Sequence, residues 1–109
     1  KQLTRVVDEY DWIFHVGDIS YADDYFTHDP IKFGYEDVYN EYMQDLEPIV
    51  SEKAYMVLPG NHESSCHSPI CILEKKYRDG LTNFTAYNSR FRMPAPESDA
   101  HGSNMWYSF

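Results

Sequence analysis

Long apolar runs and basic residues are both scarce in this sequence. No stretch of its 109 residues approaches the roughly 18 to 20 apolar residues of a membrane-spanning helix. Lysine and arginine number 9 against 18 aspartates and glutamates, which gives a formal charge of −9. Nucleic acids and anionic membranes bind basic faces. We therefore expect neither a nucleic acid nor a membrane as a partner.

Cysteine is also scarce, and the sequence begins with neither a start methionine nor a signal-peptide pattern. Cys66 and Cys71 are the two cysteines of the chain. They close a small disulfide, remain reduced, or join His62 and His67 at a zinc site, and the first is favoured because a zinc site would need more closely spaced ligand pairs. Residue 1 is lysine and no signal-peptide pattern follows, so we expect a mature or excised part of a longer protein.

One sequence triplet bears on the compartment. Asn83 begins the sequence Asn-Phe-Thr, which is an acceptor for N-glycosylation. Such a triplet beside a disulfide favours a secreted, extracellular glycoprotein.

The length fits one domain or part of one. A hydrophobic content of 42% is enough for a packed core. No internal repeat and no linker divides the chain. Most of the acidic residues are expected to be solvated surface, because several fall on one helical segment.

Hydrophobic periodicity predicts a strand, a helix and a second strand. Residues 12–16 are apolar at nearly every position, which is typical of a parallel strand covered on both faces. Residues 35–50 repeat apolar side chains at helical spacing, and Pro48 should kink or end this helix. Residues 54–59 form the second strand. This order predicts a βαβ unit with parallel strands, and therefore an α/β fold.

The remaining segments are predicted with less detail. Residues 1–10 are expected to end an amphipathic helix, residues 72–77 to form a short helix, and residues 104–109 to form a strand. We expect Tyr87, Phe91 and Met93 to pack in the core. His15 is expected to be a hydrogen-bonded core residue. We expect His28, His67 and His101 to lie in loops or at the surface.

Polar side chains follow both predicted strands directly. Gly17 and Asp18 follow the first strand with Tyr21 close behind, and Gly60, Asn61 and His62 follow the second. The carboxyl ends of parallel strands meet at one edge of a sheet, where α/β proteins bind their ligands. Carboxylate, phenol, amide and imidazole groups suit a di-metal site of iron, manganese or zinc.

These two motifs, Gly-Asp-Ile-Ser-Tyr-Ala-Asp at 17–23 and Gly-Asn-His-Glu at 60–63, resemble those of the purple acid phosphatases. That group is the tyrosinate-containing branch of the metallophosphoesterases, and the fungal and plant members are the most similar. The resemblance implies an α/β sandwich whose βαβ unit carries metal ligands at the strand ends. It covers nearly the whole chain, so residues 1–109 are expected to be a central part of the catalytic domain.

The resemblance also implies a role for each matching residue. Asp18 bridges two metals, Tyr21 binds Fe(III), and Asn61 binds a divalent zinc, iron or manganese ion. His62 contacts the substrate phosphate and helps to protonate the departing oxygen. Glu63 either holds a ligand in place or is structural. The implied reaction is the hydrolysis of phosphate monoesters by an acid phosphatase.

The family's Asp-x-Gly motif and its two later histidine motifs are missing from the sequence. Three protein ligands hold two ions poorly, so we expect the chain to be inactive without the rest of the catalytic domain. The alternative is a non-catalytic relative with a binding or structural role.

Overall fold

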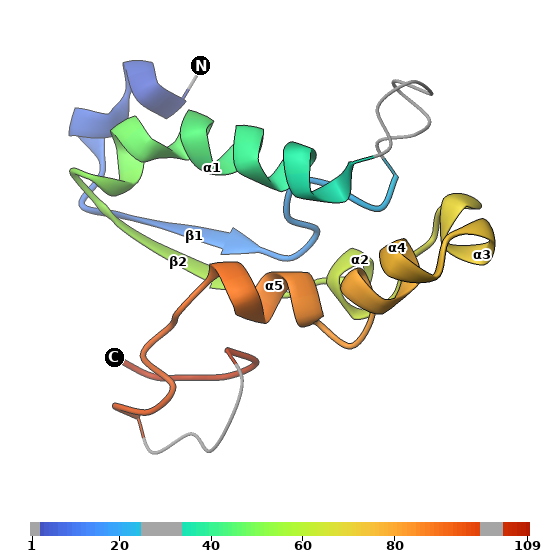
Figure 1. The fold of residues 1–109 in the computed structure, drawn as a ribbon. Coiled ribbons are helices and arrows are strands. Elements are labelled where there is room, and N and C mark those ends of the chain that lie inside the picture. Colours follow the sequence, from blue (N-terminus) through green and yellow to red (C-terminus); the bar gives the residue numbers. More distant parts are fainter. Residues whose placement is uncertain (1–2, 25–33, 99–103) are drawn as a thin grey trace.

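The computed structural model describes residues 3–24, 34–98 and 104–109 and shows an α/β arrangement (Figure 1). Two short 3-10 turns, Leu3–Arg5 and Val7–Glu9, precede strand β1. The remaining elements are β1 (Trp12–Val16), α1 (Tyr35–Val50), β2 (Ala54–Leu58), α2 (Asn61–Ser64), α3 (Ile70–Leu73), α4 (Lys75–Gly80) and α5 (Thr85–Arg90). None of the helices within these residues is long and apolar enough to span a membrane.

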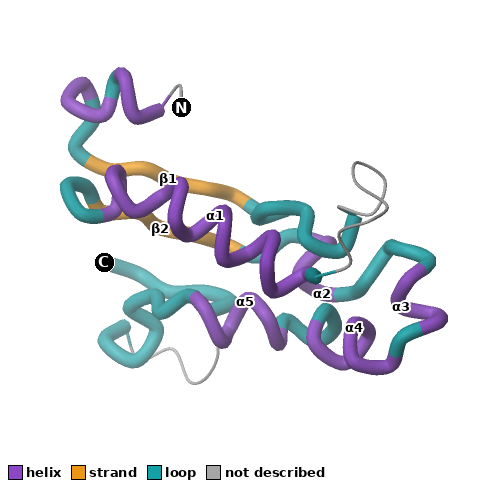
Figure 2. Tube along the Cα trace, turned by 45° about the horizontal axis from the view of Figure 1, so that its top comes forward, coloured by secondary structure: helices purple, strands orange, loops and turns teal. Residues whose placement is uncertain are grey.

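The predicted βαβ unit is confirmed. Strands β1 and β2 pair in parallel, in a register that runs from Trp12 opposite Ala54 to Val16 opposite Leu58. Helix α1 connects them and lies along both strands, while α2, α3 and α4 gather beyond their carboxyl ends (Figures 1 and 2). Because both strands end at the same edge, the segments that follow them are neighbours.

Helix α1 forms where the periodicity predicts it. Glu36 and Asp37 occupy its first turn, where the helix dipole favours negative charge. Its buried face consists of Val38, Tyr39, Leu46 and Ile49. The helix continues past Pro48 to Val50, so Pro48 does not end it. A proline so near the end of the helix costs little stability, because few helical hydrogen bonds lie beyond it.

Two expectations for the first strand and the segment before it are wrong. Trp12 and Phe14 are each 48% exposed and Val16 is 74% exposed, so the described chain covers one face of β1 only in part, through the Phe109 ring. The reason is that α1 packs on the opposite face only. Residues 3–9 form 3-10 turns without buried side chains instead of an amphipathic helix.

The predicted strand at residues 104–109 is also wrong. These residues form a turn and an irregular segment. They contact the sheet through side chains, since the Tyr107 hydroxyl donates to the Val57 carbonyl at 2.8 Å. The Phe109 ring lies 5.6 Å from the ring of Trp12. Side-chain contacts of this kind hold the segment on the sheet without backbone hydrogen bonds to a neighbouring strand.

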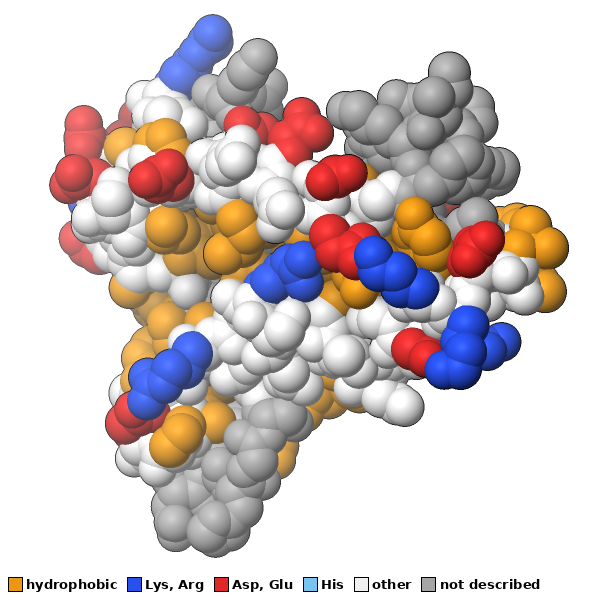
Figure 3. All heavy atoms as spheres, in the orientation of Figure 1, with side chains coloured by type: hydrophobic (Ala, Val, Ile, Leu, Met, Phe, Trp, Pro, Cys, Tyr) orange, Lys and Arg blue, Asp and Glu red, His pale blue; other side chains and the backbone are white. Residues whose placement is uncertain are grey.

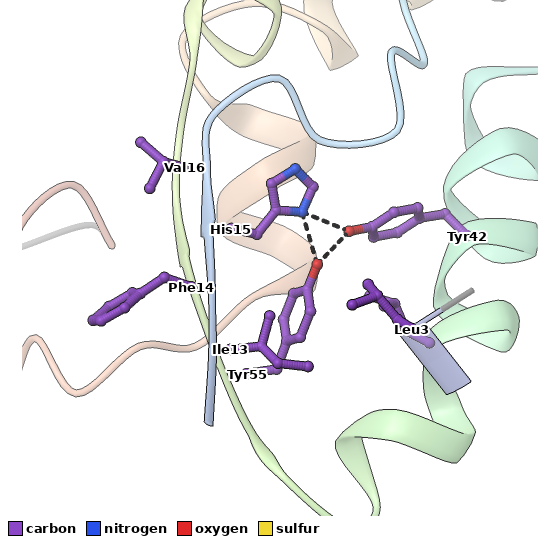
Figure 4. A pocket seen from close by; sticks show the side chains of 8 residues that line it. Leu3, Ile13, Phe14, His15, Val16, Tyr42 and Tyr55 are labelled. Atoms are coloured by element: carbon purple, nitrogen blue, oxygen red, sulfur yellow. Dashed lines mark hydrogen bonds between the residues drawn. The ribbon is translucent and has the colours of Figure 1, made fainter. Parts of the chain in front are cut away.

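His15 is hydrogen-bonded, as predicted, but it is half-buried at the wall of a cavity rather than in the core. Its Nδ1 atom lies 2.9 Å from the Tyr42 hydroxyl and 2.7 Å from the Tyr55 hydroxyl (Figure 4). These groups line a cavity of about 410 Å³ between β1, α1 and the first 3-10 turn. Burial raises the pKa of both phenols, so both remain protonated, and their hydroxyls also lie 3.0 Å from each other.

The core lies between α1, β2 and α5. Val57 and Tyr87 are wholly buried, and Phe91 and Met93 pack with them, which confirms the predicted core residues. The Met93 sulfur accepts a hydrogen bond from the Val57 N–H. Figure 3 shows acidic and basic side chains interspersed over one face of the molecule rather than gathered into patches. This distribution agrees with acidic residues acting mainly as solvated surface.

We predict that Tyr87→Phe lowers the free energy of unfolding by about 1 to 2 kcal/mol, because it leaves a buried carbonyl without its donor. The Tyr87 hydroxyl donates to Asn104 O at 2.9 Å. Tyr10→Phe removes the same atom from an exposed ring and should change stability by less than about 0.5 kcal/mol. Urea unfolding of the protein that contains this chain tests both, and equal effects would contradict the prediction.

Candidate metal centre

The ends of β1 and β2 are in close backbone contact. The Gly17 N–H donates to the Leu58 carbonyl at 2.8 Å, which extends the parallel pairing past the strands. A Cβ atom on Gly17 would lie 3.1 Å from the Gly60 Cα, and one on Gly60 would collide with the Asp18 carboxylate. The two turns can approach this closely only because both positions are glycine.

The Glu63 carboxylate joins the two turns. It is buried, and it accepts backbone hydrogen bonds from Asp18 at 3.0 Å, from Ile19 at 2.6 Å and from Gly60 at 2.6 Å. Consecutive backbone N–H groups that converge on an anion in this way form a stable nest. Glu63 therefore holds the turn after β1 against the start of α2.

The turn after β1 has an unusual backbone. Asp18, Ser20 and Tyr21 all have positive φ angles, of 52°, 63° and 48°. Left-handed conformations cost non-glycine residues about 1 kcal/mol or more each. The hydrogen bonds to Glu63 and the complete burial of Ile19 offset this cost.

Asp18 faces both halves of the site. Its Oδ2 atom accepts a hydrogen bond from the Tyr21 hydroxyl at 3.3 Å, and its Oδ1 atom accepts one from the His62 backbone N–H at 3.3 Å. The two oxygens of one carboxylate thus point to the segments after different strands. Residues that the sequence places far apart are brought together here as predicted.

Tyr21 lies at the exposed side of the site. The pKa of its phenol is raised, chiefly because the Asp18 carboxylate lies beside the hydroxyl. Two anions at this separation repel each other. Ionisation of the phenol therefore requires a compensating positive charge.

His62 and His67 share the buried carboxylate of Asp23. The His62 Nδ1 atom lies 2.8 Å from Asp23 Oδ2, and the His67 backbone N–H donates to the same oxygen at 3.0 Å. The His62 ring lies between the rings of Tyr21 and His67, with centroid distances of 4.6 and 4.7 Å. Asp23, His62 and His67 each offer a ligand atom within 4.8 Å of the others.

Asn61 begins α2 and is exposed. Its Nδ2 atom lies 3.5 Å from His67 Nε2. His67 is exposed and lies in the loop after α2, as predicted. The sequence did not predict its contacts with Asn61 and with the buried Asp23 carboxylate, and it assigned no role to Asp23. Asp23 is the last residue of the first motif, so the motif could have indicated that it belongs to the site. These contacts of His67 have no local signal in the sequence, because they depend on the path of the loop after α2.

That loop is closed by a disulfide between Cys66 and Cys71, which confirms the predicted pairing. The alternative in which these cysteines bind zinc with His62 and His67 is therefore wrong. Asn83 is exposed, and its backbone N–H donates to Ser64 O at 2.9 Å beside α2. His28 and His101 lie outside the described residues.

The chain belongs to the calcineurin-like phosphoesterase family, whose model matches residues 1–107. This family membership agrees with an α/β fold and implies a metal centre.

Several curated proteins are similar to the chain. Acid phosphatase A of Cryphonectria parasitica is 37% identical over 89% of this chain and 20% of its own length. Probable purple acid phosphatase 20 of Arabidopsis thaliana is 35% identical over 93% of this chain and 19% of its own. Probable inactive purple acid phosphatase 1 of the same plant is 36% identical over 58% of this chain and 9% of its own. The chain thus spans a fifth or less of these relatives, and no solved structure matches it significantly.

We predict that Glu63→Gln lowers the free energy of unfolding by about 2 to 3 kcal/mol, because an amide offers one acceptor oxygen and turns an NH₂ group toward N–H donors. Glu52→Gln, at an exposed position, should change it by less than about 0.5 kcal/mol. Urea unfolding distinguishes the two. Similar values would show that Glu63 does not hold the turns together.

Proposed function

We propose that the protein containing this chain is an acid phosphatase that hydrolyses phosphate monoesters at a centre of Fe(III) and a divalent zinc, iron or manganese ion. The observation that carries the proposal is the orientation of Asp18, whose two oxygens face Tyr21 on one side and the start of α2 on the other. A carboxylate in this position can bridge two cations. The names of the similar acid phosphatases support the same reaction.

The donor atoms at this edge fit two different ions. Asp18 and Tyr21 offer hard oxygen ligands, and a phenolate is a good ligand for a strongly acidic ion such as Fe(III). Asn61, which begins the neighbouring helix α2, offers an amide oxygen to the divalent ion. When bound, two such ions activate water as the nucleophile and offset the negative charge of the phosphoryl group.

His62 acts on the substrate. Asp23 accepts a hydrogen bond from the Nδ1 side of the ring and thereby fixes the ring orientation, with Nε2 as the nitrogen available to the substrate. With Nδ1–H donated to Asp23, the ring can donate from Nε2 only as the imidazolium, which carries a proton on both nitrogens. In that form His62 would contact the phosphate and pass its Nε2 proton to the departing alkoxide as the ester P–O bond breaks, which leaves an alcohol and, after attack by water, inorganic phosphate. Asp23 and the rings of Tyr21 and His67 limit the movement of the His62 ring.

Asp18, Tyr21 and Asn61 are too few to hold two ions well. We infer that residues 1–109 are part of a larger catalytic domain, and that other segments of the protein supply the remaining ligands. The lengths of the similar relatives support this inference. The 109-residue chain alone is then inactive.

We also infer that the protein is secreted and glycosylated at Asn83. The disulfide is typical of an oxidising compartment, and Asn83 is exposed, as a glycan acceptor must be.

The alternative is a non-catalytic relative with a binding or structural role. One similar protein is named as probably inactive, which keeps this alternative open to test. The arrangement in which the Asp18 carboxylate contacts both the Tyr21 hydroxyl and the His62 backbone favours catalysis over a purely structural role. Hydrolysis of p-nitrophenyl phosphate by the full-length, metal-loaded protein tests the proposal, and absence of turnover with both ions bound would favour the alternative.

Asp18→Asn in the full-length protein should lower kcat/KM by more than the roughly 10- to 100-fold seen when residues that only support a metal ligand are changed. An amide cannot bridge two cations as a carboxylate does. Metal analysis of the purified variant should show loss of both ions. Near-normal metal content and turnover would exclude a bridging role.

Tyr21→Phe should abolish the visible absorption band expected from a tyrosinate bound to Fe(III). The ring remains, so its packing against His62 is kept while the oxygen ligand is lost. Visible spectroscopy with iron analysis makes the comparison, and Tyr10→Phe provides the control at an exposed tyrosine. A band that persists in Tyr21→Phe would contradict the assignment of Tyr21 as the iron ligand.

A further inference from the structure

His67 is held beside the candidate metal centre by its backbone as well as its ring. Its N–H donates to the buried Asp23 carboxylate, and its ring lies against His62. The disulfide between Cys66 and Cys71 begins at the preceding residue and closes the loop. The position of the His67 ring is therefore set by the loop and by Asp23 together.

The Nε2 atom of His67 has three polar neighbours. They are the Ser65 hydroxyl at 3.2 Å, the Asn61 carbonyl oxygen at 3.3 Å and the Asn61 side-chain Nδ2 at 3.5 Å. The Asn61 carbonyl already accepts hydrogen bonds from the Ser64 hydroxyl at 2.7 Å and the Ser65 N–H at 3.2 Å. A carbonyl oxygen has two lone pairs, and both are engaged.

If Nε2 carried the ring proton, only the Ser65 hydroxyl could accept it, and the Asn61 NH₂ group would face another donor. If Nε2 is unprotonated, both neighbours can donate to it, so the acceptor form is the one compatible with these contacts. In this tautomer the ring proton is on Nδ1, and the Nε2 lone pair faces the NH₂ group of Asn61 and the Ser65 hydroxyl. The hydrogen bond from Asn61 then fixes which way its carboxamide is turned.

We propose that His67 is a positioning residue for Asn61. A carboxamide binds a cation through its oxygen and not through its NH₂ group, and rotation by half a turn exchanges the two. By accepting a hydrogen bond from Nδ2, His67 keeps Oδ1 on the opposite side, available to the divalent ion. This role rests on the proposed function, in which Asn61 is a ligand of that ion.

His67→Ala in the full-length protein should weaken Zn²⁺ binding at the divalent position by about 10-fold, as loss of a residue that orients a metal ligand commonly does. Iron content and the visible band should remain, because Tyr21 and Asp18 are unchanged. His67→Gln retains an acceptor and should restore part of the affinity. Competition with a chelator of known affinity measures Zn²⁺ binding.

The decisive comparison uses Asn61→Asp. A carboxylate presents an oxygen in either rotamer and has no NH₂ group to hold, so adding His67→Ala to Asn61→Asp should leave Zn²⁺ affinity unchanged. A 10-fold loss in both backgrounds would overturn the proposal. It would assign the effect to a disturbed loop, or to an ion held by Asp23, His62 and His67 themselves.

Two further variants separate the remaining outcomes. Ser65→Ala removes the other neighbour of Nε2 and should not weaken Zn²⁺ binding, whereas a loss as large as that of His67→Ala would overturn the proposal.

Asn61→Ala should weaken Zn²⁺ binding strongly. If it does not, Asn61 is not a ligand and the metal assignment fails. If it does while His67→Ala has no effect, the assignment stands and the positioning role of His67 is excluded.

Discussion

The hydrogen bonds that Glu63 accepts from three backbone N–H groups are the constraint on which the rest of the candidate site depends. They connect the turn after β1 to the start of α2. Hydrogen bonds to a charged acceptor are worth more than neutral ones, and a buried carboxylate without them would be costly. The turn they hold is left-handed at several non-glycine residues, so without Glu63 it would relax toward ordinary backbone angles. Asp18 and Tyr21 would then lose their orientation.

A second buried carboxylate, that of Asp23, organises the other side in the same way. It binds the ring of His62 and the backbone of His67. Asp18, Asp23 and Glu63 thus bring three negative groups together at one edge of the sheet. Their hydrogen bonds come from backbone N–H groups, a phenol and an imidazole. Such an environment favours cations, and it raises the pKa of the Tyr21 phenol.

The parts of the fold that follow from local pattern were predicted well. The apolar stripe and acidic first turn of residues 35–50 identify α1, and two short apolar runs identify β1 and β2. The parts that depend on neighbours were not. The exposed face of β1, carrying Trp12 and Phe14, has the same apolar composition as a buried one. Residues 104–109 are aromatic enough for a strand, yet they use Tyr107 and Phe109 to contact the sheet from outside the ladder.

The sequence by itself determined that the residues directly following the two strands meet at the candidate site, but not that Asp23 and His67 join them. Asp18, Tyr21, Asn61 and His62 directly follow two strands, and parallel pairing places such residues at one edge. Only the tertiary structure decided how they are held. Three contacts hold them, and each requires atoms to be placed to within a few tenths of an ångström: Glu63 with Asp18, Asp23 with His62, and His67 with Asn61. The last also depends on the path of a disulfide-closed loop. No spacing rule contains that information, because hydrogen bonds between residues distant in sequence form only after packing has fixed both backbones.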